Sequence, residues 1–215
     1  TAIEGRERAA KKEKKEKVKK KKGRPKKGEI REAKEEKRLD RQINQSFEEA
    51  LKELPTVCDI GSKKNSKGYL ETWKGYKLHV DVNDCGLPVS AVLTSASVHD
   101  SQAAIPMMKM TSKRVDYLYD LMDAAYDAGQ IYETSKSLGH VPLIDKNRRG
   151  GDAIPMAPHE AVRYNERTVV ERFNSRIKED FGARNVMVKG AEKVKTHLMF
   201  GIIALFADQL LKLAN

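Results

Sequence analysis

The sequence predicts a mixed α/β domain that follows a strongly basic arm. The 215 residues carry a formal net charge of +11, but residues 1–28 hold 14 Lys and Arg against 4 acidic residues, while residues 29–215 hold 28 against 27. After residue 55, segments with the period of a strand alternate with segments that have the period of a helix. Their order is hairpin, helix, strand, helix, strand, helix, helix, which is typical of a mixed sheet with helices packed on it.

The basic arm, residues 1–28, is expected to be disordered and to favour polyanions, because the release of counterions from DNA drives such binding. It ends in KKKKGRPKKG, where Lys22, Arg24 and Lys26 are the candidate DNA-binding residues. The Gly-Arg-Pro triplet around Arg24 resembles the core of an AT-hook, which lies in a narrow A·T minor groove. A purely electrostatic arm and a tail that only increases solubility remain alternatives.

Residues 29–55 make a second segment, which is predicted to hold one helix of about twenty residues and a linker. Apolar side chains recur every three or four residues in a charged background, and Pro55 ends the pattern. The apolar stripe consists of Leu39, Ile43, Phe47, Leu51 and Leu54. We expect this helix to dock on the body of the protein or on a partner.

Residues 56–215 are assigned to the main domain, which begins with a polar, loop-like stretch. From Trp73 the sequence alternates between apolar and polar residues as a strand does, a turn follows at residues 83–86, and a second apolar strand covers residues 87–95. Together they predict an antiparallel hairpin. A helix is expected to follow, from about residue 101 to residue 110.

The next strand, within residues 115–123, is the first with a candidate functional residue. It ends at Asp123, and a helix that stops at Gly139 follows. A short strand, HVPLIDKN, comes next and carries Asp145 at its end. Open α/β sheets place their sites at the carboxyl ends of strands, so both aspartates are candidates on position alone.

Two more helices are predicted, at about residues 158–181 and 191–213. Because 100° separates successive residues of a helix, one face of the first helix carries a polar stripe where a surface helix normally carries its apolar seam. The stripe consists of Tyr164, Arg167, Glu171, Asn174 and Lys178, and the apolar face consists of Val169, Val170, Phe173, Ile177 and Phe181. A solvated charged face is the plain interpretation of such a stripe.

The functional interpretation treats Asp123 and Glu171 as catalytic metal ligands. Mg²⁺ prefers oxygen ligands and is typically held by a few carboxylates together with substrate phosphates. Two such ions can activate an attacking oxygen and stabilise a leaving one in phosphodiester displacement. Arg167 and Lys178 would then bind flanking phosphates, and Tyr164 would bond to a phosphate or pack against a sugar or base.

These motifs resemble those of bacterial insertion-sequence transposases with an Asp-Asp-Glu triad. The Tyr-x2-Arg-x3-Glu-x6-Lys spacing of residues 164–178 matches the YREK signature of one large group, LMDAAYDA resembles its second-Asp motif, and WKGYKLHVDV with LTSASVHDS resembles the preceding hairpin. The resemblance implies an RNase H-like mixed sheet flanked by helices, with Asp123 as the second catalytic Asp and Glu171 as the third acid. It also implies DNA-phosphate roles for Tyr164, Arg167 and Lys178.

The resemblance further implies the reaction and its components. Two Mg²⁺ ions, for which Mn²⁺ can substitute, would support cleavage of double-stranded DNA at the element ends and attack of the freed 3′-OH groups on target DNA. A homodimer is expected for the complete enzyme. The expected location is the bacterial cytoplasm near the nucleoid, which fits two isolated cysteines without a CxxC pair. Residues 198–213 contain Asp208, Gln209 and Lys212, so we expect no membrane span.

The family's first Asp and the strand that carries it are not found in the sequence. In relatives this Asp commonly begins an Asp-Ser-Thr triplet, of which Thr1 would be the third residue; Asp59 is the internal alternative. We therefore expect the chain to be a fragment that is inactive by itself. A truncated remnant that only binds DNA or interferes with an intact transposase is one alternative, and a DNA-compacting protein is another.

Overall fold

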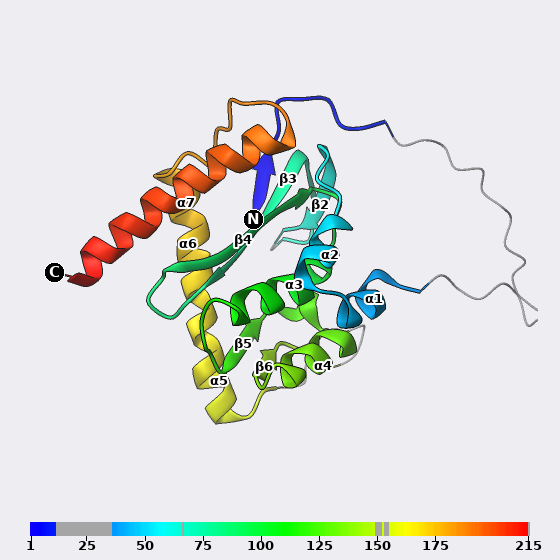
Figure 1. Cartoon of the computed structure of the whole chain (residues 1–215), viewed down its shortest axis with the longest axis vertical. Helices are drawn as coiled ribbons and strands as arrows, with labels where there is room; N and C mark the ends of the chain where they lie inside the picture. Colours follow the sequence, from blue (N-terminus) through cyan, green and yellow to red (C-terminus); the bar gives the residue numbers. More distant parts are fainter. Residues whose placement is uncertain (12–35, 66, 149–151, 153–154, 215) are drawn as a thin grey trace, which may run out of the picture.

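The computed structural model describes residues 1–11, 36–65, 67–148, 152 and 155–214, and these form two sheets flanked by helices (Figure 1). The first sheet is built around one long central strand. Its strands are β1 (Ala2–Glu4), β2 (Asp59–Lys64), β3 (Leu70–Val82) and β4 (Pro88–Ser95). The second sheet is a parallel pair, β5 (Tyr119–Met122) and β6 (Val141–Ile144).

The predicted hairpin is confirmed as β3 and β4, which pair antiparallel from Tyr76 opposite Ser95 to Val82 opposite Pro88. The polar stretch before it was expected to be a loop, and this expectation is wrong. Residues 59–64 form β2, which pairs antiparallel with the first half of β3. Gly61 allows the close approach, because a Cβ there would lie 2.5 Å from the ring of Trp73.

The arm boundary is also corrected, because residues 1–28 do not all lie outside the domain. Residues 2–4 form β1, which pairs with β3, and Ile3 is fully buried. The reason is the apolar side chain of Ile3, which packs in the core between the sheet and the C-terminal helices. Lys22, Arg24 and Lys26 lie outside the described residues.

The single helix expected within residues 29–55 is two short helices in the structure. They are α1 (Arg38–Asn44) and α2 (Phe47–Lys52). Ser46 starts the second helix with a capping box, in which its hydroxyl accepts from the Glu49 amide while the Glu49 carboxylate accepts from the Ser46 amide. This cap starts a new helix at residue 47 and so divides the expected one. The apolar side chains of both short helices pack on the neighbouring helix α3 (Ser101–Ser112).

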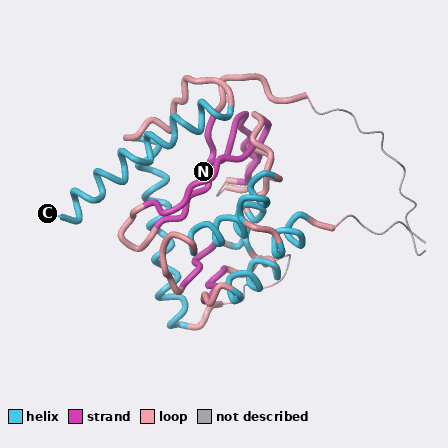
Figure 2. Tube along the Cα trace, in the orientation of Figure 1, coloured by secondary structure: helices cyan, strands magenta, loops and turns pink. Residues whose placement is uncertain are grey.

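Helices cover both faces of the first sheet (Figure 2, helices in cyan and strands in magenta). On one face, α6 (Thr168–Glu179) and α7 (Ala191–Ala214) pack on β3 and β4, and the buried residues there include Tyr76, Leu78 and Phe173. On the other face lies α3, which also contacts α4 (Gly129–Ser137) of the second sheet. The predicted helices at 101–110 and 191–213 are thereby confirmed, with small shifts of their ends.

The long helix expected at residues 158–181 has a break in its middle. It consists of α5 (Pro158–Tyr164), the 3₁₀ turn η2 (Asn165–Arg167) and α6. The expected apolar face is present, since Val169, Phe173 and Ile177 are buried. Figure 1 shows this helical run alongside both sheets, so it links them.

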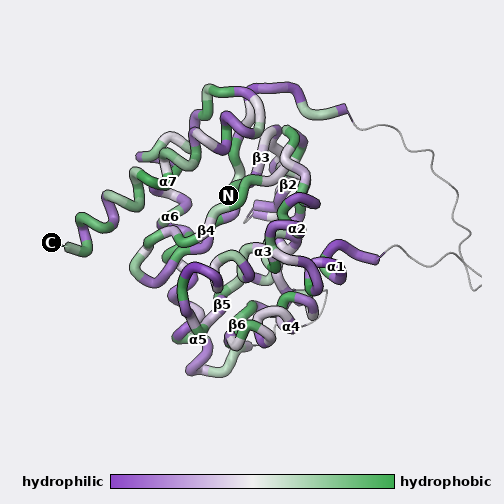
Figure 3. The backbone as a smooth tube through the Cα atoms, viewed as in Figure 1, coloured by the Kyte–Doolittle hydropathy of each residue, from purple (hydrophilic) through white to green (hydrophobic). Residues whose placement is uncertain are grey.

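Helix α7 is the one helix among the described residues that is long and apolar enough to cross a membrane. Figure 3 shows its largely hydrophobic course. This is weak evidence for a span, because a core helix passes the same test, and one side of α7 is buried through Val194, Leu198 and Leu205. Its opposite side exposes Phe200 and Ile203.

Candidate active site

Asp123 lies where a strand end and a tight turn meet. Strand β5 ends at Met122, and Asp123 then caps the 3₁₀ helix η1 (Ala124–Tyr126), accepting a hydrogen bond from the Ala125 amide at 2.9 Å. Its side chain is exposed. Asp145 follows the end of β6 in the same way, but it does not line the cleft described below, whereas Asp123 does.

Glu171 is presented by the first turn of α6, where Arg167 pairs with it. The Arg167 Nη2 atom donates to the Glu171 Oε1 atom at 2.8 Å, and the guanidinium also lies 5.6 Å from the ring centroid of Tyr164. Three residues of the predicted polar stripe are therefore together. The 3₁₀ turn at residues 165–167 does not separate them, because Arg167 and Glu171 keep the i, i+4 spacing.

Arg167 pairs with Glu171, and the charge of Asp123 also acts on its guanidinium. Partial burial lowers the pKa of Arg167, but Tyr164, Glu171 and Asp123 raise it by more, so the net shift is upward. The two predicted metal ligands thus come from different segments and act on the same guanidinium. In the present arrangement this cation neutralises the carboxylate of Glu171.

Lys178 lies farther along α6, near the first sheet. Partial burial lowers its pKa, and the nearby cations Lys63 and Arg184 lower it further, against the opposing effect of Glu179 and Glu4. Lys178 does not line the cleft described below, whereas Arg167 and Glu171 do.

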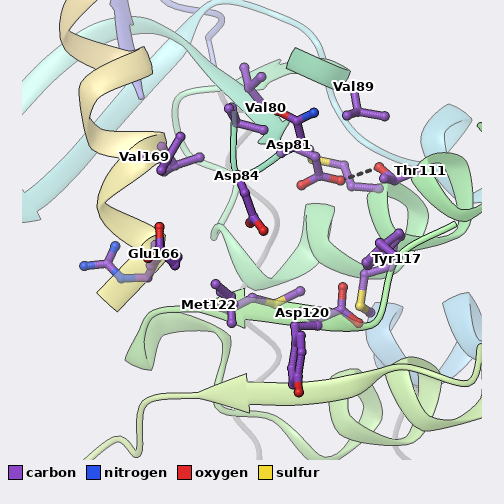
Figure 4. A pocket seen from close by; sticks show the side chains of 18 of the residues that line it. Val80, Asp81, Asp84, Val89, Thr111, Tyr117, Asp120, Met122, Glu166 and Val169 are labelled. Atoms are coloured by element: carbon purple, nitrogen blue, oxygen red, sulfur yellow. Dashed lines mark hydrogen bonds between the residues drawn. The ribbon is translucent and has the colours of Figure 1, made fainter. Parts of the chain in front are cut away.

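A cleft of about 820 Å³ lies between the two sheets, and both Asp123 and Glu171 line it. Figure 4 shows the side chains that line this cavity, among them Asp81, Asp84, Asp120 and Glu166. Its lining contains eight carboxylates against two guanidinium groups. The carboxylates are Asp81, Asp84, Asp100, Asp116, Asp120, Asp123, Glu166 and Glu171, and the guanidinium groups are those of Arg163 and Arg167.

Sequence reasoning missed two acidic residues that also line this cleft, Asp81 and Asp120. Asp81 accepts a hydrogen bond from the Thr111 hydroxyl, and burial raises the pKa of Asp81 to about 6. Asp120 is buried and accepts from the Ser135 hydroxyl at 2.6 Å, with His140 Nδ1 at 3.1 Å. Both alternate with apolar residues along a strand. The sequence therefore shows only that they lie on the polar face of that strand, and a face turned to solvent has the same pattern.

The internal alternative for the first acid, Asp59, is not in this cleft. It begins β2, opposite Gly75, and its carboxylate accepts from the Ile60 amide. Among the described residues, no group of three His, Cys, Asp or Glu side chains is arranged to hold a metal ion. The donors of Asp123 and Glu171 are hard oxygens, which suit a divalent ion held by one or two carboxylates together with substrate phosphates.

Residues 49–207 match the family described as the transposase DDE domain. The chain belongs to the DDE transposase family. No curated protein and no solved structure gave a match. The mixed sheets and flanking helices are accordingly those of an RNase H-like DDE domain. DNA is the substrate of this family, and DDE transposases generally use divalent metal ions. The match confirms the predicted family and leaves the YREK group a prediction.

Proposed function

We propose that this transposase domain serves metal-dependent cleavage and strand transfer of DNA, with Asp123 and Glu171 as its metal-binding carboxylates. The observation that carries the proposal is that Asp123, at a strand end, and Glu171, on α6, line the same acidic cleft, with Arg167 paired to Glu171. Mg²⁺ ions bound there would activate the attacking oxygen and stabilise the leaving one. In this role Arg167 exchanges Glu171 for a DNA phosphate, which its planar fork suits.

The proposed chemistry has two steps. In cleavage, a water oxygen bonds to a phosphorus at the element end while the bond to the 3′ oxygen breaks, which leaves a free 3′-OH. In strand transfer, this 3′-OH bonds to a phosphorus of target DNA and another 3′-OH leaves. Tyr164 and Lys178 are proposed to hold the flanking DNA backbone, because both lie on the same helical run as Glu171.

A two-ion site needs a further bridging carboxylate, and we propose that the chain does not cleave DNA without it. Nicking of DNA by the 215-residue chain with Mg²⁺ or Mn²⁺, abolished by Asp123→Ala, would contradict the proposal.

The metal site is tested by Mn²⁺ binding in the presence of a short DNA duplex. We expect Asp123→Ala to weaken Mn²⁺ binding by at least about tenfold, because one of two carboxylate ligands is lost. Electron paramagnetic resonance of free Mn²⁺ measures this. Asp145→Ala is the matched control, since Asp145 also follows a strand end and does not line the cleft. Equal affinities in the two variants would remove Asp123 from the site.

The basic arm, with Lys22, Arg24 and Lys26, is proposed to add DNA affinity that does not depend on sequence. Deletion of residues 10–28 should weaken DNA binding and flatten its dependence on salt, because each lost phosphate contact reduces the slope of log K against log salt by about 0.9. Fluorescence anisotropy at several salt concentrations measures this slope. An unchanged slope would exclude the arm from DNA binding.

Two further proposals concern the assembly and its location. The functional transposase is proposed to be a homodimer, which sedimentation of the protein on DNA carrying two element ends would test; a single protomer per complex would contradict it. Its place is proposed to be the bacterial cytoplasm, at the chromosome. Fluorescence microscopy of a tagged chain tests this, and a signal confined to the cell envelope would refute it.

A further inference from the structure

The second half of helix α7 reverses the arrangement of an ordinary surface helix, whose polar side faces outward. None of its residues from 206 to 214 is buried, and Figure 1 shows this half extending beyond the body. Its polar side chains face the body, because Gln209 Nε2 donates to the Cys85 carbonyl at 2.8 Å and Asp208 pairs with Arg176. Its large apolar side chains are exposed, namely Phe206, Leu210, Leu211 and Leu213.

The exposed side of α7 also has the spacing of a seam between paired helices. Six residues along it are separated by 4, 3, 4, 3 and 4 positions, a repeat that keeps them on the side of a helix that faces a second helix. The buried residues Val194, Leu198 and Leu205 lie on the opposite side. The seam consists of Thr196, Phe200, Ile203, Ala207, Leu210 and Ala214.

A hollow on this seam has the form that receives a side chain from another helix. In paired helices, each seam residue enters a hole between four residues of the facing helix, at positions i, i+3, i+4 and i+7. A shallow hollow of about 320 Å³ lies on the exposed side of α7. The residues that line it include four at this spacing, Thr196, Met199, Phe200 and Ile203.

A second copy of the chain fits this seam when the two helices run antiparallel. If the seams overlap fully about a two-fold axis, Phe200 lies opposite Leu210 of the second copy, and Ile203 lies opposite its Ala207. Large side chains then face small ones at the centre, which favours even packing. Leu210 of the second copy also lies over the hollow, and antiparallel helices place opposite ends of their dipoles side by side.

The exposed apolar area is sufficient for a pair of this kind. Six large residues of α7 are exposed by 37–68 %. A residue of this size presents roughly 150–250 Å² when fully exposed, so each copy offers on the order of 600 Å². Two copies would bury about 1,200 Å², which is the lower end of the range for specific interfaces. The six residues are Phe200, Ile203, Phe206, Leu210, Leu211 and Leu213.

We propose that the outer face of α7 is a self-association surface on which two copies of this chain pair antiparallel, with Ile203 and Ala207 next to the two-fold axis. The proposal rests on the homodimer proposed above and names its interface. A lipid bilayer is a poorer occupant, because a span would have to withdraw Val194, Leu198 and Leu205 from the core.

Sedimentation equilibrium of the 215-residue chain without DNA tests the surface. The parent chain should dimerise, and Ile203→Glu should raise the dissociation constant at least about tenfold, because the dimer would bury an unpaired carboxylate from each copy. Ile60→Glu on β2 is the matched control, since Ile60 is 58 % exposed and Ile203 is 62 % exposed. The control should leave the dissociation constant unchanged, and circular dichroism should show both variants folded.

Disulfide trapping tests the orientation with two chains, one carrying Phe200→Cys and the other Leu210→Cys. Both also carry Cys85→Ser, which removes the exposed native thiol, whereas Cys58 is buried. On mild oxidation the mixture should form a covalent dimer of unlike chains, because facing residues of the two helices come within reach of a disulfide. Each chain oxidised alone should remain largely unlinked.

Several outcomes would overturn the proposal. They are a monomer at every concentration reached, equal weakening by Ile60→Glu and Ile203→Glu, and disulfides between like chains only. Binding of the monomer to phosphatidylcholine vesicles, lost in Ile203→Glu, would assign the face to a bilayer instead. A dimer that forms only on DNA and is unaffected by Ile203→Glu would overturn this interface and leave the homodimer on DNA standing.

Discussion

Helix α6 has two different faces, an apolar one that is buried in the core and a polar one that faces the cleft. Its back packs Phe173 and Ile177 into a dry core with β3 and α7, and its front presents Glu171, with Arg167 in the turn just before it, to an acidic cleft. On the back, removing atoms leaves a cavity that the surroundings cannot fill. On the front, the groups are partly solvated and their charges oppose each other. The buried side of this helix therefore stabilises the fold, and the side toward the cleft carries the groups proposed for the chemistry.

The largest effect is expected on the back of the helix. Phe173→Ala should lower the free energy of unfolding by about 3–5 kcal/mol, because the ring of Phe173 is nearly fully buried in the core. Urea unfolding followed by circular dichroism measures the change. Asn174→Ala, the next residue and part of the cleft lining, is the control and should have a much smaller effect. Equal losses would mean that the two sides do not differ in packing.

In the cleft, removing the charge of Asp81 is expected to raise the free energy of unfolding, whereas Phe173→Ala lowers it. The pKa of Asp81 is raised from 3.8 to about 6 by burial and by Asp120, against the hydrogen bond from Thr111. The folded state therefore binds this proton more tightly than the unfolded chain, and the contribution of Asp81 to stability falls as pH rises from about 4 to 6. Asp81→Asn should then stabilise the protein by about 2 kcal/mol above pH 6.5 and have little effect below pH 4.

Unfolding midpoints measured from pH 4 to pH 8 check this prediction. Asp116→Asn provides the matched control, because Asp116 also lines the cleft but is exposed. A loss of stability in the Asp81→Asn variant at pH 7.5 would show that the carboxylate is stabilised in the cleft, and the contrast between the two sides of α6 would then fail.

The smallest effect on stability is expected at the site itself. Glu171→Gln should change the free energy of unfolding by less than about 0.5 kcal/mol, because its ion pair with Arg167 is largely exposed. Thermal unfolding measures this. A loss above about 2 kcal/mol would indicate that Glu171 has a structural role, and its assignment as a metal ligand would lose its main physical support.

Local patterns predicted the fold well where one face of an element is buried. The hairpin β3–β4, the strands β5 and β6 and the helices α3 and α7 follow from alternation and helical period. The prediction failed where hydrogen bonds to the backbone, rather than the burial of apolar side chains, determine the local structure. Strand β2 lacks apolar alternation and forms because β3 offers an edge, and the capping box at Ser46 divides the first predicted helix.

For the site, the sequence by itself determined which side chains share a helical face and that Asp123 and Asp145 each follow a strand. That information is local, since it depends on the 100° rotation per residue and on the alternation of strands. Only the tertiary structure decided that Asp123 and Glu171 line one cleft, that Asp120 is buried there, and that Asp81 lies half-buried beside Thr111. These facts depend on contacts between segments far apart in the chain, which no local period records.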